Sequence, residues 1–293
     1  MKKLLLPAFL LVGSSLALSS LQAADTPPLK VLLITGGCCH DYTKQKDILK
    51  AGLEERANIV VTQIHVETTK GFETKPALPI YGNPDYAKGY DVVVHDECAA
   101  GIADQAVIEG VLKPHRDGIP GVNLHCAMHS YRIGNPNEAT TELGTPHSLW
   151  FEYLGLQSSG HGSQDPIAIS YIDKESPITK GLSDWTTGKE ELYNNIKIFE
   201  TAHPLAHGKQ TGHVKKKNAD GTETVEEKTN EFVDVWTNLY NGKTRVFSTT
   251  TGHNNDTVAE GKYLDLVTNG LLWACDKLDA DGHPKAGYGP HGK

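Results

Sequence analysis

The chain has 293 residues and a formal net charge of −8, and 38% of its residues are hydrophobic. This length permits one large α/β domain or two small ones. An acidic chain is a poor ligand for nucleic acid or anionic membrane, so neither partner is expected. Five cysteines are too few for a disulfide scaffold, and an odd number cannot all pair within one chain. We therefore interpret most of them as small buried residues.

The N-terminus has the pattern of a secretory signal peptide. Lys2 and Lys3 precede an apolar run at residues 4–18, and the small residues Ala23 and Ala24 follow. The run is too short for a good membrane span, and no later segment approaches that length. We therefore expect a signal peptide at residues 1–23, cleavage after Ala23, and an exported protein that is periplasmic or secreted.

The first half of the mature chain alternates between strand-like and helix-like segments. Short apolar runs predict strands at residues 31–35, 59–64, 90–95 and 121–124. Amphipathic spacing predicts helices at residues 44–56 and 103–115. This alternation, with short links, favours an α/β fold of the flavodoxin-like, doubly wound type, with a mostly parallel sheet and helices on both faces.

The second half is less regular. Strands are predicted at residues 167–172, 196–201, 232–237 and 244–249, followed by a closing helix at residues 262–276. Residues 213–228 are charged and nearly free of apolar side chains, which predicts an exposed hairpin tip or a mobile loop. We expect one domain at residues 24–278 and a disordered, Gly- and His-rich tail at residues 279–293.

Three of the predicted strands are followed by histidines, namely His40, His125 and His253. Ligands of open α/β sheets bind at the carboxyl ends of the strands, so these side chains are expected to share one site. If a small substrate lies between His125 and His253, their imidazoles should be within about 10 Å of each other.

Several separated segments resemble the trehalose-utilisation, or ThuA-like, family. The likeness lies in residues 33–37 with His40, 123–127, 176–182, 190–193, 236–247, 251–253 and 269–274. The resemblance implies a class I glutamine-amidotransferase-like α/β fold in which His125 replaces the nucleophilic cysteine of the amidotransferases. Two departures stand out: Cys38 and Cys39 occupy the turn where a second histidine is expected, and residues 212–229 look like an insertion.

The candidate site residues follow from the strand ends and from this resemblance. His125 and His253 are the candidate acid–base pair, and Glu97 could orient a histidine or act as a base. In the structural alternative, the histidines cap turns or pack in the core, and Glu97 is an acid at a helix N-terminus. The candidate substrate-binding residues are His40, Asp41, Asp96, His129, Arg132, His161 (in a loop that could close over the site) and Asn254.

The resemblance implies an exported carbohydrate-active enzyme, an isomerase, lyase or hydrolase that acts on sugars or glycosides, including those oxidised at C3, by His-based acid–base chemistry. One alternative is a non-catalytic sugar-binding protein, and another is a hydrolase or amidase that uses Cys126 as nucleophile and His253 as base. No cofactor is firmly implied, because neither a dinucleotide fingerprint nor a Walker motif is complete. A divalent metal stays open, since histidine and carboxylate ligands suit Zn, Mn or Fe. A homo-oligomer is compatible with the sequence.

Overall fold

The computed structural model describes residues 26–67, 72–140, 142–218 and 220–290. Its strands are β1 (Leu29–Gly37), β2 (Ile59–Val66), β3 (Val92–Cys98), β4 (Gly121–Leu124), β5 (Leu156–Tyr171), β6 (Trp185–Ile198), β7 (Ala202–Lys217), β8 (Glu223–Tyr240) and β9 (Thr244–Thr249). Its helices are α1 (Tyr42–Arg56), α2 (Gln105–Asp117), the 3₁₀ helix η1 (His125–His129), α3 (Leu149–Leu154), α4 (Asn255–Val258) and α5 (Gly261–Ala274). The signal peptide expected at residues 1–23 lies outside the described residues.

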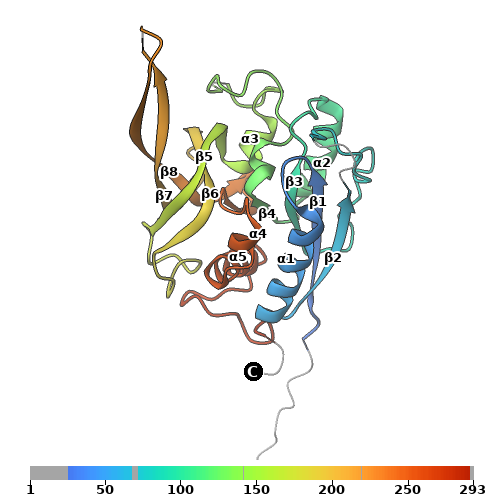
Figure 1. Cartoon of the computed structure of the whole chain (residues 1–293). Helices are drawn as coiled ribbons and strands as arrows, with labels where there is room; N and C mark the ends of the chain where they lie inside the picture. The colour runs from blue at the N-terminus through green and yellow to red at the C-terminus, as the bar shows by residue number, and fades with distance from the viewer. Residues whose placement is uncertain (1–25, 68–71, 141, 219, 291–293) are drawn as a thin grey trace, which may run out of the picture.

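Five strands of the nine-stranded sheet are parallel and have the flavodoxin-like order β2-β1-β3-β4-β9. Figure 1 shows β2, β1, β3 and β4 of this part. Both faces of the sheet are covered, as strand β1 shows: Val31 and Leu33 belong to one hydrophobic core, and Leu32 and Ile34 belong to another. Helices α1 and α5 supply the first core, and α2 and α3 supply the second. A strand buried on both faces reads as a continuous apolar run. The predicted fold class is confirmed.

The sheet continues beyond β9 with four antiparallel strands in the order β8-β7-β5-β6. The hairpin predicted around residues 213–228 is confirmed, since β7 and β8 pair up to Lys217 and Glu223 (Figure 1). The strand predicted at residues 196–201 is wrong in its bounds, because β6 ends at Ile198 and β7 begins at Ala202. These strands are long, polar and bulged, so they lack the apolar alternation that would have marked their ends.

Residues 279–290 are ordered, in contrast to the disordered tail predicted for residues 279–293. Leu278 and Pro284 form an isolated β-bridge, and the side chain of Lys277 lies over the ring of Tyr288. Asn58 binds this segment from the end of α1: its backbone N–H donates to the carbonyl of Tyr288, and its side-chain amide donates to that of Gly287. These hydrogen bonds fix a segment whose composition suggested a free tail. Among the described residues, no helix combines the length and the apolar character needed to cross a membrane.

Candidate active site

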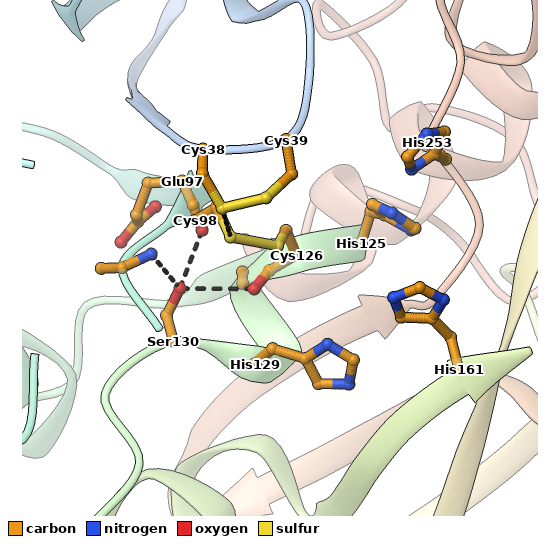
Figure 2. Close-up of a disulfide and its surroundings, with 12 residues drawn as sticks. Cys38, Cys39, Glu97, Cys98, His125, Cys126, His129, Ser130, His161 and His253 are labelled. Carbon is orange, nitrogen blue, oxygen red and sulfur yellow. Dashed lines mark hydrogen bonds between the residues drawn. A yellow bond between two sulfur atoms is a disulfide. The ribbon is translucent and has the colours of Figure 1, made fainter. Parts of the chain in front are cut away.

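Three imidazoles meet at the carboxyl ends of the parallel strands. His40 follows β1, His125 follows β4 and His253 follows β9. The ring centroids lie 4.7 Å apart for His40 and His125, 4.6 Å for His40 and His253, and 5.3 Å for His125 and His253. We call His40, His125 and His253 the histidine cluster. The imidazoles of His125 and His253 lie well within the expected 10 Å and on the same side of the site (Figure 2).

Unusual backbone conformations at the strand ends orient the side chains of His125 and His253 toward each other. His125 has a φ of +42° at the turn from β4 into η1, a conformation that is unusual for a non-glycine residue. Such outliers persist only where the surrounding structure holds them, and they concentrate at functional sites. Gly252, with a φ of +131°, precedes His253, and a Cβ there would lie 2.8 Å from the Tyr263 hydroxyl oxygen. The turn before His253 therefore requires glycine.

The buried carboxylate of Glu190 holds the loop that carries His253. It accepts hydrogen bonds from the backbone N–H groups of Gly252 (3.2 Å), His253 (2.9 Å) and Asn254 (3.0 Å). Charge-assisted bonds of this kind are stronger than neutral ones. Glu190 therefore positions the His253 ring from strand β6 without touching it.

The neighbouring carboxylate of Glu191 reaches the histidines themselves. Its Oε2 lies 3.2 Å from His253 Nδ1, 3.6 Å from His125 Nε2 and 3.5 Å from His161 Nδ1. The Gln164 amide donates to its Oε1 and also contacts His253 Nε2 at 2.8 Å. Glu191 is thus a shared negative partner of three imidazoles.

This arrangement sets the ionisation of the site. Burial alone would raise the pKa of Glu191, but its contacts with His125 and His253 outweigh burial and hold that pKa well below its usual value. Burial lowers the pKa of His253, but the nearby Glu191 carboxylate more than compensates, and the pKa is raised. The pKa of His40 lies well below its usual value because the ring is buried and because His125 and His253 are close to it. The geometry thus holds an anionic carboxylate, a basic imidazole and a neutral imidazole together.

A polar pocket with a volume of about 730 Å³ opens beside the cluster. His40 and His253 lie in its wall together with Asp41, Gln164 and Lys189. Asn254, Asn255, Asp256 and Thr257 complete the polar lining. Asp41 also pairs with Lys44 and accepts a hydrogen bond from Asn255, so it fixes the rim where α1 and α4 begin.

The predicted substrate-binding residues His129, Arg132 and His161 lie in or next to η1 and in β5 and are not in the lining of this pocket. The rings of His129 and Tyr193 stack with their centroids 4.0 Å apart, and His129 Nε2 lies 2.9 Å from the Ser158 hydroxyl. Burial lowers the pKa of His129 well below its usual value, and the Arg132 charge adds to this effect. Arg132 donates to the Ser158 carbonyl and so fixes β5 against η1. His161 lies in strand β5 rather than in a loop, which corrects the expected lid.

Four cysteines gather beside the histidine cluster and form disulfides between Cys38 and Cys39 and between Cys98 and Cys126 (Figure 2). The sulfur atoms of Cys38 and Cys98 lie 3.5 Å apart. Cys38, Cys98 and Cys126 are buried, as predicted for most of the cysteines, but each is paired in a disulfide. Cys275 is unpaired and half-buried, and burial raises the pKa of its thiol to about 12. Cys126 has no free thiol to act as a nucleophile.

Glu97 and Asp96 do not join the cluster, which corrects their predicted roles. Glu97 is turned away from His125 and His253 (Figure 2). Its Oε1 lies 2.8 Å from His95 Nδ1 and accepts a hydrogen bond from the Tyr131 hydroxyl at 2.7 Å. Asp96 is also buried and does not line the pocket, and burial and the neighbouring Glu97 raise its pKa. Strand β3 runs on to Cys98, so both side chains are still part of the pleated sheet.

Glu97→Gln is expected to lower the free energy of unfolding by about 1–3 kcal/mol, since it leaves the buried His95 with a weaker partner. Urea unfolding measures this loss. The exposed Glu226→Gln on β8 is the matched control and should change stability by less than about 0.5 kcal/mol. The folded variant should retain the activity of the wild type. An inactive Glu97→Gln protein of unchanged stability would instead give Glu97 a catalytic role.

A known protein family matches most of the chain. The family model described as trehalose utilisation, ThuA, matches residues 30–274. The chain belongs to the ThuA family. No curated protein matches it.

Two solved structures resemble this ThuA-family chain at low sequence identity. One is a Thermoplasma acidophilum protein described as a GMP synthase subunit, with 12% identity and a TM-score of 0.46 over 86% of this chain and 96% of the other. The second is the glutaminase domain of Trypanosoma brucei CTPS with bound acivicin, with 7% identity and a TM-score of 0.45 over 89% of this chain and 99% of the other.

Sequence reasoning on this ThuA-family chain missed the roles of Glu190, Glu191, Gln164 and Tyr193. Glu190, Glu191 and Tyr193 lie in a segment noted only for its family resemblance. Their position next to the histidines depends on the antiparallel pairing of β6 with β5, where Gln164 is opposite Glu191 and His161 is opposite Tyr193. The adjacent carboxylates Glu190 and Glu191, followed by the apolar Leu192 and Tyr193, were the one feature of the sequence that could have indicated buried acids at this position.

Proposed function

We propose that this chain is an exported enzyme that acts on keto sugars, specifically on glycosides oxidised at C3, by acid–base chemistry at the histidine cluster. The observation that carries the proposal is the convergence of three imidazoles and Glu191 beside a polar pocket, with His40 and His253 in the pocket wall. Membership of the trehalose utilisation family supports a carbohydrate substrate.

The pocket lining suits a polyol. Carboxylates and side-chain amides accept or donate hydrogen bonds to hydroxyl groups, and Asp41, Asn254, Asn255, Asp256 and Gln164 supply both kinds. Lys189 adds three donors at the same wall. A volume of about 730 Å³ lies in the usual range for small-molecule sites, so a monosaccharide ring with a substituent would fit.

The cluster has the groups that chemistry next to a ketone requires. A carbonyl at C3 acidifies the C2–H bond, and an imidazole such as His253 would take that proton as a base. In an elimination, the C–H electron pair forms the C1–C2 double bond, the C1–O bond breaks, and the leaving oxygen receives a proton from an acid such as His125. Glu191, close to both rings, stabilises whichever imidazole becomes charged.

Export is supported by the N-terminal pattern and by the cysteines. Disulfides persist in oxidising compartments and are rare in the cytosol. Four of the five cysteines are paired, and the exposed Cys39 is one of them. A cysteine-dependent hydrolase fits the site less well, because Cys126 is bonded to Cys98.

The test incubates the purified chain with a 3-keto-glucoside and with the unoxidised parent glucoside, and follows products by NMR. We expect turnover of the keto compound only, because only its C2–H bond is acidified. Absence of turnover across a panel of keto sugars, combined with saturable sugar binding, would replace the enzyme with a sugar-binding protein.

A further inference from the structure

Each residue of the histidine cluster has one buried ring nitrogen that makes no well-formed hydrogen bond among the described residues, and for two of them the only nearby acceptor is the Glu191 carboxylate. These atoms are His40 Nδ1, His125 Nε2 and His253 Nδ1. Buried polar atoms are rarely left unpaired, so each such atom needs an explanation, and an ion is one of the common ones. Each of the three residues also offers a nitrogen to a set whose members all lie within 4.8 Å of one another.

The opposite nitrogens of two rings are already fixed. His125 Nδ1 lies 2.6 Å from the Thr250 carbonyl oxygen, so it must carry the proton and donate it. That hydrogen bond leaves Nε2 with a free lone pair directed into the cluster. His253 Nε2 accepts a hydrogen bond from the Gln164 side-chain N–H at 2.8 Å, so in the metal-free site the ring proton lies on Nδ1, which faces Glu191. Coordination through Nδ1 would move this proton to Nε2 and turn the Gln164 amide oxygen toward it. Ligand histidines typically have their second nitrogen bound by a carbonyl, carboxylate or similar group, which sets the tautomer and the ring orientation.

Glu191 supplies the negative charge that such a site needs. Its Oε2 lies 3.2 Å from His253 Nδ1 and 3.6 Å from His125 Nε2, so it would approach the same ion as these two nitrogens. Three imidazoles and one carboxylate form a common ligand set for zinc and related divalent ions. Tetrahedral ligands about 2.1 Å from zinc are roughly 3.4 Å apart, so the rings would close by about an ångström around the ion. The adjoining pocket, with His40 and His253 in its wall, gives an entry path.

The cysteines beside the cluster offer no competing site. Cys38, Cys39 and Cys98, and likewise His40, Cys98 and Cys126, also lie close enough together to surround an ion. Sulfur binds metals as a thiolate, however, and these four sulfur atoms are held in disulfides. The geometry therefore favours the nitrogen and oxygen set.

We propose that His40, His125 and His253 bind a divalent transition metal ion, with zinc as the preferred ion and Glu191 as the fourth protein ligand. The inference rests on the same site as the proposed function but not on its substrate. It changes the role of His125 and His253 from proton carriers to ligands. A metal in this position would polarise the sugar carbonyl and activate water at neutral pH.

The experiment uses the full mature chain, purified without a histidine tag and kept under non-reducing conditions. Elemental analysis gives the bound metal, and calorimetric titration of chelator-treated protein with ZnCl₂ gives the affinity. We expect one ion per chain, with zinc affinity at least about 100-fold weaker in His125→Gln and His253→Gln and about 10–100-fold weaker in Glu191→Gln. Two histidines outside the cluster, the exposed His203 and the half-exposed His207, give the matched controls His203→Gln and His207→Gln, which should bind as the wild type does.

The wild-type titration decides the matter even if a variant fails to fold. No saturable zinc binding by the wild type, or undiminished binding by folded His125→Gln and His253→Gln, would overturn the metal site. Metal bound at one ion per chain without turnover of keto sugars removes the proposed reaction and leaves the metal site in place. Full turnover after complete removal of metal would show that the reaction needs no metal, because the imidazoles would then carry the protons themselves.

Discussion

His125→Ala and His253→Ala should each lower kcat/KM on the keto-sugar substrate by about 10²–10⁴-fold, which is the usual contribution of a general acid or base. Loss of a metal ligand would give a reduction of at least this order. The two rings lie 5.3 Å apart and share Glu191 as a partner, so they act on the same small volume. The double variant should therefore lose less than the product of the two single losses, since residues that act as a unit are not additive.

Steady-state kinetics on the three variants measures these losses, with the exposed His203→Ala as the matched control. The His203 side chain is exposed and pairs with Asp173, not with a residue of the cluster, so its variant should have wild-type rates. Thermal unfolding should confirm that the variants are folded. Wild-type rates in either single variant, or strictly multiplicative losses in the double variant, would contradict a shared site.

The parallel half of the sheet was predictable because its residues are constrained on both faces. Strand β1 reads as an apolar run since Val31 to Ile34 alternate between two cores, and its end is marked by Gly36 and Gly37. The same reasoning placed His40, His125 and His253 at one edge, because parallel strands bring their carboxyl ends together.

The error at Glu97 has a simple physical origin. The apolar run ends at Val94, so strand β3 was expected to end near residue 95, with Asp96 and Glu97 in the following loop. The strand instead continues to Cys98, and the two-residue period of the pleat places Glu97 on the same face as Val93 and His95. When the last residues of a strand are buried but polar, apolar patterning predicts that the strand ends too early.

Glu191 could not be placed from the sequence for a different reason. Its approach to the cluster requires β6 to pair with β5 through a register that contains several bulges, and β5 to pair with β7. A shift of one residue would turn Glu191 to the other face and bring its neighbour inward. Local patterns do not determine such a register, whereas the packed structure does.

The core on the α2 side of the sheet should make the protein sensitive to acid through His115. Its Nδ1–H donates to the Ile119 carbonyl, and its Nε2 lies 3.1 Å from His95 Nε2. Burial, with a further contribution from His95, lowers the pKa of His115 to about 3. An unfolded histidine has a pKa of about 6.5, so between these values the unfolded chain binds a proton that the folded chain does not. Stability should therefore be full above about pH 6.5 and should fall as the pH decreases toward 3, by on the order of 4–5 kcal/mol in total.

Urea unfolding at a series of pH values between 4 and 7, at the ionic strength of a common buffer, measures this slope. His115→Gln removes the titrating group, and its amide oxygen can still accept a hydrogen bond from His95, so the slope should become shallower even if the variant is less stable at pH 7. The exposed His203→Gln removes a histidine that is not buried and should retain the wild-type slope. A slope that is identical in the wild type and His115→Gln would show that other groups cause the acid sensitivity. The sign of the effect is decisive, because a histidine stabilised in its charged form would instead lose stability as the pH rises.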